Sequence, residues 1–139
     1  MRVVSVNTGA VRPLRIGSRN VPSGIGKAAV SGPVAVMPLG LLGDEQADLS
    51  VHGGLDKAVY AYPLAHYALW EAQRSQQGAS LFNDALPMGF MGENLTIDGL
   101  LETEVWIGDL LHFPGCSLRV TAPREPCHKF NAVMGLPNA

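Results

Sequence analysis

Residues 58–76, AVYAYPLAHYALWEAQRSQ, decide most about the fold because they change from a strand pattern to a helix pattern. Residues 58–62 have the apolar and aromatic composition of a buried strand. Pro63 suits the first turn of a helix, where no backbone N–H donor is needed. Apolar residues then recur at helical spacing: Leu64, Tyr67, Ala68 and Trp70. We therefore predict a strand over 58–62 and the main helix over 63–76.

Short strand patterns lie on both sides of this segment, and turns rich in Gly and Pro separate them. The predicted strands cover 2–6, 28–30, 34–39, 94–97, 103–107, 110–113 and 117–122. We expect residues 11–23 to be a polar connection, 83–92 a loop or short helical turn, and 131–134 a short helical segment. Many short strands with one main helix predict a mostly β fold, a β-barrel with helical decoration.

The 139 residues predict a single domain, with no internal repeat or linker that would mark a second one. A net charge of −2 gives no general attraction to nucleic acid, so we expect no nucleic-acid polymer as partner. No apolar run approaches the roughly 18 residues that span a membrane. The chain begins as a strand, without a secretory pattern, which predicts a cytoplasmic protein. In the cytoplasm we expect the two cysteines, Cys116 and Cys127, to be free thiols.

A glycine-rich polar segment precedes the main helix: residues 40–57, GLLGDEQADLSVHGGLDK. Its ionisable residues include Asp44, Asp48, His52, Asp56 and Lys57. Three glycines, at 43, 53 and 54, can let backbone N–H groups converge on an anion. Taken singly, each residue fits an ordinary surface loop whose aspartates cap turns. Taken together, they favour a loop that binds a polar or phosphorylated ligand.

A second polar segment, PREPCHK at residues 123–129, surrounds Cys127 with Arg124, His128 and Lys129. Positive neighbours favour thiolate, which is both the nucleophilic and the metal-binding form of cysteine. A buried cysteine that packs as a small apolar residue is the alternative. Cys116 has no basic neighbours and fits that alternative. The local sequence supports either interpretation of Cys127.

Eight motifs occur in an order that resembles the MOSC family (molybdenum cofactor sulfurase C-terminal domain), in its YiiM-like subgroup. They are SGIGK at 23–27, GPV at 32–34, GLLGDEQAD at 40–48, HGGLDKAV at 52–59, YPLAHYALW at 62–70, GENLT at 92–96, IGD at 107–109 and PREPCHKFNA at 123–132. The series covers nearly the whole chain. It implies one MOSC domain over 1–139 with a barrel similar to the pyruvate kinase β-barrel domain. Compared with YiiM-like chains, the C-terminal part is missing, so we expect the barrel to be incomplete there.

The resemblance also implies an enzyme that uses the molybdenum cofactor (molybdopterin). Its relatives reduce N-hydroxylated bases, detoxifying compounds such as 6-hydroxylaminopurine, with a flavoprotein reductase as electron donor. Cys127 is then both the catalytic residue and the thiolate ligand of molybdenum. The residues expected to hold the cofactor are Lys27, His52, Gly53, Gly54, Asp56, Lys57, Asn94 and Arg124.

Two other functions fit the same motifs. Cys127 could carry a persulfide in a sulfur-carrier or cofactor-handling module. The chain could also be a pterin-binding domain without catalysis. The cofactor interpretations make one structural prediction: residues 40–57 and Cys127 should face one cavity although they lie far apart in the sequence.

Overall fold

Four strands pair into the central sheet of the computed structural model, which describes residues 1–80 and 85–137. The strand order is β4 (Ala28–Ala29), β1 (Arg2–Thr8), β8 (Leu95–Asp98) and β7 (Ala61–Pro63). Strand β1 is antiparallel to β4 and β8, whereas β7 is parallel to β8. Leu95, Thr96 and Ile97 are all buried, so β8 forms the centre of this sheet.

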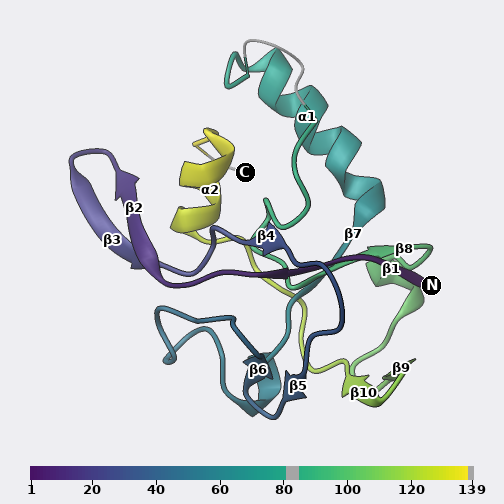
Figure 1. The fold of residues 1–139 in the computed structure, drawn as a ribbon. Helices are drawn as coiled ribbons and strands as arrows, with labels where there is room; N and C mark the ends of the chain where they lie inside the picture. The colour runs from purple at the N-terminus through teal and green to yellow at the C-terminus, as the bar shows by residue number, and fades with distance from the viewer. Residues whose placement is uncertain (81–84, 138–139) are drawn as a thin grey trace.

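The other strands form three two-stranded hairpins: β2 (Arg12–Ile16) with β3 (Arg19–Ser23), β5 (Val36–Met37) with β6 (Gly40–Leu41), and β9 (Leu110–Phe113) with β10 (Cys116–Arg119). The described residues therefore confirm a mostly β fold with one main helix. They form several small sheets and no closed barrel, whereas the prediction was a barrel that is incomplete at its C-terminal part. Strands of only two residues, as in β4, β5 and β6, leave too few backbone groups to link neighbouring sheets into a continuous ladder. Figure 1 shows the β2–β3 hairpin projecting from the body, and the other two hairpins on the opposite side of the sheet from the helices.

The main helix is confirmed as α1 (Tyr67–Gln76), and a 3-10 turn (Leu64–His66) precedes it. Pro63 has extended backbone angles and ends β7, so the α-helix begins four residues later than predicted. The short C-terminal helix α2 (His128–Met134) is longer than expected and ends at Gly135 with a positive φ of 70°.

Helices α1 and α2 lie on the same side of the central sheet (Figure 1) and share the hydrophobic core. Tyr67 of α1 and both Phe130 and Met134 of α2 are buried in this cluster. The Trp70 and Phe130 rings meet edge to face, with their centroids 5.4 Å apart. This contact fixes the start of α2, and therefore Cys127, relative to α1.

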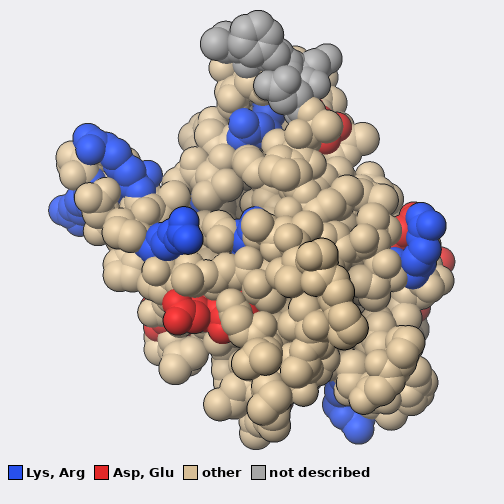
Figure 2. Space-filling view, in the orientation of Figure 1, with Lys and Arg blue, Asp and Glu red and all other residues tan. Residues whose placement is uncertain are grey.

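Two predicted segments differ from the structure. Residues 11–23 form the β2–β3 hairpin, because Leu14 and Val21 pair on a half-buried face and Gly17, with φ 59°, opens the turn. The exposed arginines of these strands interrupt the apolar pattern, so the strands are difficult to recognise in the sequence. Figure 2 shows the basic side chains gathered on the hairpin. Residues 103–107 form no strand, because Glu104 accepts a hydrogen bond from the backbone of Leu101 and closes a 3-10 turn (Glu102–Glu104).

Strand β10 begins one residue before the predicted strand and ends at Arg119 instead of residue 122. The predicted loop 83–92 begins outside the described residues, and its last part is a turn in which the backbone N–H of Gly92 donates to the carbonyl oxygen of Gly89. Within the described ranges, no helix is both long and apolar enough to cross a membrane.

Candidate functional site

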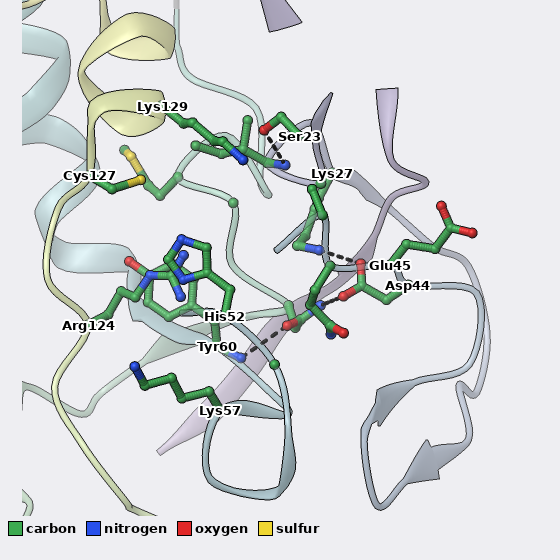
Figure 3. A pocket seen from close by; sticks show the side chains of 18 residues that line it. Ser23, Lys27, Asp44, Glu45, His52, Lys57, Tyr60, Arg124, Cys127 and Lys129 are labelled. Carbon is green, nitrogen blue, oxygen red and sulfur yellow. Dashed lines mark hydrogen bonds and ion pairs between the residues drawn. The ribbon is translucent and has the colours of Figure 1, made fainter. Parts of the chain in front are cut away.

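The polar loop and Cys127 line one pocket, as the sequence predicted. The pocket's wall contains Ser23, Gly24, Ile25, Lys27, Asp44, Glu45, Gln46, Ala47, His52, Gly53, Lys57, Tyr60, Met91, Gly92, Asn94, Arg124, Cys127 and Lys129. Figure 3 shows Cys127 at the start of α2, with His52 and Arg124 reaching the same space from segments far apart in the sequence. Seven of the residues expected to bind or react are therefore brought together: Lys27, His52, Gly53, Lys57, Asn94, Arg124 and Cys127.

A buried ion pair between Lys27 and Asp44 forms one wall of this pocket. Their side chains are only 6% and 1% exposed. Asp44 also accepts hydrogen bonds from the backbone N–H of Gly9 (2.9 Å) and the side-chain amide of Asn94 (2.9 Å). The charge of Lys27 is thus neutralised within the protein, which argues for a role in holding the loop in place.

Asn94 is buried and joins three segments around the pocket. Its amide nitrogen donates to Asp44 and to the backbone oxygen of Asn7 (3.2 Å), and its side-chain oxygen accepts from the backbone N–H of Tyr60 (3.0 Å). Both amide N–H groups and the amide oxygen therefore have protein partners. In this structure Asn94 positions the wall of the pocket.

His52 lies at the centre of the positive part of the site. Partial burial lowers the pKa of its imidazole, and the charges of Arg124, Lys129 and Lys57 lower it further. Its Nδ1 atom is buried and has no hydrogen-bond partner among the described residues. A buried polar atom of this kind usually meets a partner from water or a ligand.

Three cations face this histidine. Lys57 Nζ donates to the carbonyl oxygen of Val51 (3.1 Å), and Lys129 Nζ to that of Pro22 (2.7 Å). The Arg124 guanidinium lies 5.1 Å from the centroid of the Tyr60 ring, which holds it by a cation–π contact. Each ammonium has three N–H donors and the guanidinium has five, so donors remain for an anion in the pocket.

Cys127 is a half-buried thiol at the junction of the pocket and the hydrophobic core. It is the residue directly before α2, it forms no disulfide with Cys116, and its backbone oxygen accepts from the N–H of Asn131. Among the described residues, no group of three or more His, Cys, Asp and Glu could hold a metal ion by itself. A single thiolate with nearby cations fits a metal that arrives already bound to an anionic cofactor.

Two residues of the predicted set do not line this pocket: Gly54 and Asp56. Asp56 lies in the 3-10 turn (Leu55–Lys57), and Gly54 is the residue that caps the start of this turn. Lys57 faces the pocket, whereas Asp56 lines a separate cavity near β10. Asp48, another candidate acceptor, binds the backbone N–H and hydroxyl of Ser50. These hydrogen bonds lower the Asp48 pKa and identify it as a turn residue.

Sequence reasoning missed several residues of the pocket, chiefly Ser23, Glu45, Tyr60 and Met91. The sequence did not mark Tyr60 as a site residue, because a tyrosine in a strand usually packs in the core. In the structure the Arg124 guanidinium lies over its ring. Glu45 accepts from the backbone N–H of Val11 (2.6 Å) and so ties the loop to the segment before β2. Only the fold brings these residues to the pocket.

The fold and site define a small, mostly β domain that presents one thiol at a pocket lined by cations. The MOSC domain family model matches residues 48–139, and the chain belongs to this family. The chain is 39% identical over 128 residues to protein YiiM of Escherichia coli (strain K12), which covers 92% of this chain and 54% of that protein. It is 33% identical over 138 residues to a reductase of Gibberella moniliformis (strain M3125 / FGSC 7600), covering 99% of this chain and 23% of the reductase.

The fold is similar to that of a solved MOSC-type structure. The crystal structure of YiiM from Geobacillus stearothermophilus superposes with a TM-score of 0.69 at 33% identity, covering 98% of this chain and 57% of that chain. This chain thus spans little more than half the length of the two YiiM proteins and about a quarter of the reductase.

Proposed function

We propose that this domain binds the molybdenum cofactor and takes part in the reduction of N-hydroxylated bases and related compounds. The observation that carries the proposal is that Cys127, three cations and His52 meet in one pocket, where His52 Nδ1 has no hydrogen-bond partner in the described part of the chain. Membership of the MOSC domain family and similarity to a protein named as a reductase support it.

Each polar residue of the pocket has a proposed role that follows from its chemistry. Lys57, Arg124 and Lys129 would bind the phosphate of the cofactor, and His52 would donate or accept one hydrogen bond through Nδ1. The Cys127 thiolate would be the protein's ligand to molybdenum. When bound, the cofactor supplies a metal that cycles between oxidation states.

In the proposed reaction the N–O bond of an N-hydroxyamino group breaks. Two electrons and two protons convert this group to an amine, and the oxygen leaves as water. A flavoprotein reductase is the proposed source of the electrons, and the protons come from solvent. The small N-hydroxylated compound is the proposed substrate.

Molybdenum and pterin analysis of protein made in a cofactor-producing host tests the proposal. Cys127→Ala should lower the molybdenum content by at least about tenfold, because a ligand to the metal is lost. Cys116→Ala is the matched control and should keep the wild-type content, because Cys116 does not line this pocket. Equal molybdenum in the Cys127→Ala and wild-type proteins would contradict Cys127 as ligand.

The same preparations separate the two alternative functions. A sulfur carrier would hold cyanide-labile sulfur that is lost in Cys127→Ala and would show no reductase turnover. A pterin-binding domain without catalysis would contain the cofactor but would not reduce 6-hydroxylaminopurine with a reconstituted electron donor.

A further inference from the structure

A second pocket lies directly beside the first and is lined mainly by aromatic and apolar side chains. Its wall includes Tyr60, Tyr62, Leu69, Trp70, Phe130 and Cys127. Its volume is about 320 Å³, within the range of small-molecule sites. The two pockets share Ile25, Tyr60, Met91, Arg124 and Cys127. The thiol that we assign to the metal is therefore also part of the aromatic pocket.

The aromatic side chains of this pocket hold one another in fixed positions. Trp70 Nε1 donates a hydrogen bond to the Tyr62 hydroxyl (2.6 Å), so both polar groups are satisfied within the wall. Tyr62 meets Tyr60 edge to face at 6.0 Å, and Trp70 meets Phe130 at 5.4 Å. Rings fixed in this way present flat apolar surfaces at low entropic cost to a ligand that is itself flat.

The polar groups of this pocket differ in charge from those of the first. Two carboxylates, Glu102 and Glu125, face it together with Arg124. His66 Nε2 and Glu102 Oε2 are 2.9 Å apart and hold each other at the pocket. Carboxylates repel a phosphate but accept hydrogen bonds from ring or exocyclic N–H groups. The pocket therefore suits an uncharged nitrogen heterocycle better than a phosphorylated group.

We propose that the aromatic pocket binds the flat heteroaromatic ring of the substrate and directs its N-hydroxyamino group towards Cys127. This proposal rests on the proposed function, which it deepens by assigning the substrate ring to one pocket and the cofactor phosphate to the other. Tyr62, Trp70 and Leu69 are the specificity-determining residues, and the His66–Glu102 pair orients the edge of the ring. A hydroxylamine without a ring makes none of these contacts.

Ring binding can be measured without the cofactor. The chain has two tryptophans, and Trp106 is 79% exposed, so Trp106→Phe leaves Trp70 as the only tryptophan. Titration of this protein with 6-hydroxylaminopurine, and with adenine as a ring without the hydroxyamino group, should quench Trp70 fluorescence in a saturable way. No saturable quenching by either purine would overturn the proposal.

Neighbouring positions on α1 give a matched pair of variants. Leu69 lines the pocket and Ala68 does not, and both side chains are exposed on the helix. Leu69→Asp should raise the dissociation constant of the purine about tenfold, because a charge replaces apolar contact with the ring. Ala68→Asp should leave it unchanged. Equal effects of the two variants, or tighter quenching by a phosphorylated pterin than by the purines, would overturn the assignment.

Turnover then separates this proposal from the proposed function. In cofactor-loaded protein with an electron donor, Leu69→Asp should lower kcat/KM for 6-hydroxylaminopurine far more than kcat/KM for hydroxylamine, because hydroxylamine has no ring to contact Leu69. Equal loss for both compounds would contradict ring recognition at Leu69. If purines bind but neither compound is reduced, the proposed function fails while the ring-binding site is supported.

Discussion

Lys27 and Asp44 form the ion pair on which the pocket wall depends. We expect Asp44→Asn to lower the free energy of unfolding by about 3–5 kcal/mol, because the Lys27 ammonium would stay buried without its counter-charge. Urea denaturation followed by circular dichroism measures this loss.

The Arg2–Asp98 pair provides the control, since its side chains are 75% and 49% exposed. Asp98→Asn should lower the free energy of unfolding by no more than about 1 kcal/mol, because solvent screens this ion pair. Adding Lys27→Met to Asp44→Asn should recover part of the loss by removing the buried charge. If the two aspartate variants lost equal stability, the Lys27–Asp44 pair would not be the buried anchor of the loop.

His52 should titrate below its ordinary pKa of 6.5, because burial and three nearby cations disfavour its charged form. The unfolded chain then takes up its proton at higher pH than the folded one. The contribution of His52 to the free energy of unfolding is therefore complete above the pKa that the imidazole has in the unfolded chain. It is lost as the pH falls through the lower pKa of the folded protein. The NMR titration of the His52 ring protons measures the midpoint.

Changes to the pocket should move this midpoint in a defined direction. Arg124→Gln should raise the His52 pKa by removing one cation, whereas Arg15→Gln on the projecting hairpin should leave it unchanged. Inorganic phosphate in the pocket should also raise it, because an anion stabilises the imidazolium. A midpoint above 6.5 in the unliganded protein would show that the three cations do not surround His52 as described.

At the scale of elements, Gly24 permits the close approach of the end of β3 to the polar loop. A Cβ atom at this position would lie 2.3 Å from the backbone oxygen of Glu45, whereas one at Gly26 would meet no atom within 4 Å. Gly24→Ala should therefore destabilise the protein by at least about 1–3 kcal/mol through overpacking and should weaken phosphate binding. Gly26→Ala should have little effect on either. Denaturation and phosphate titration check both variants, and equal behaviour would contradict this role of Gly24.

The sequence predicted elements well where one local pattern dominated. Strand β1 follows from its β-branched residues and helix α1 from its helical spacing. Strand β9 follows from the mostly apolar run that comes directly after the Gly108–Asp109 turn. The β2–β3 hairpin was missed because its half-buried face comprises isolated apolar residues between arginines and prolines, and cross-strand pairing alone reveals it. The predicted strand 103–107 failed because local hydrogen bonds of Glu104 stabilise a 3-10 turn instead.

At the scale of the whole molecule, the central sheet and the three hairpins should differ in local stability. Strand β8 is buried and paired on both sides, while β9–β10 form a separate pair with partly exposed residues. Amide hydrogen exchange should therefore be slowest in β1 and β8 and fastest in the hairpins. Exchange measured by NMR tests this order. Equal protection of β8 and β9–β10 would indicate one continuous cooperative sheet.

The mostly β fold class, the main helix and the two polar segments can be predicted from the sequence, because they depend on residues close together in the chain. The folded structure is needed to show that the strands form several small sheets and that Lys27 and Asn94 bind other protein groups. It is also needed to show that Gly54 and Asp56 lie outside the pocket. It also placed the aromatic pocket next to Cys127. These features depend on contacts between residues far apart in sequence, whose direction and burial are fixed only when the chain packs.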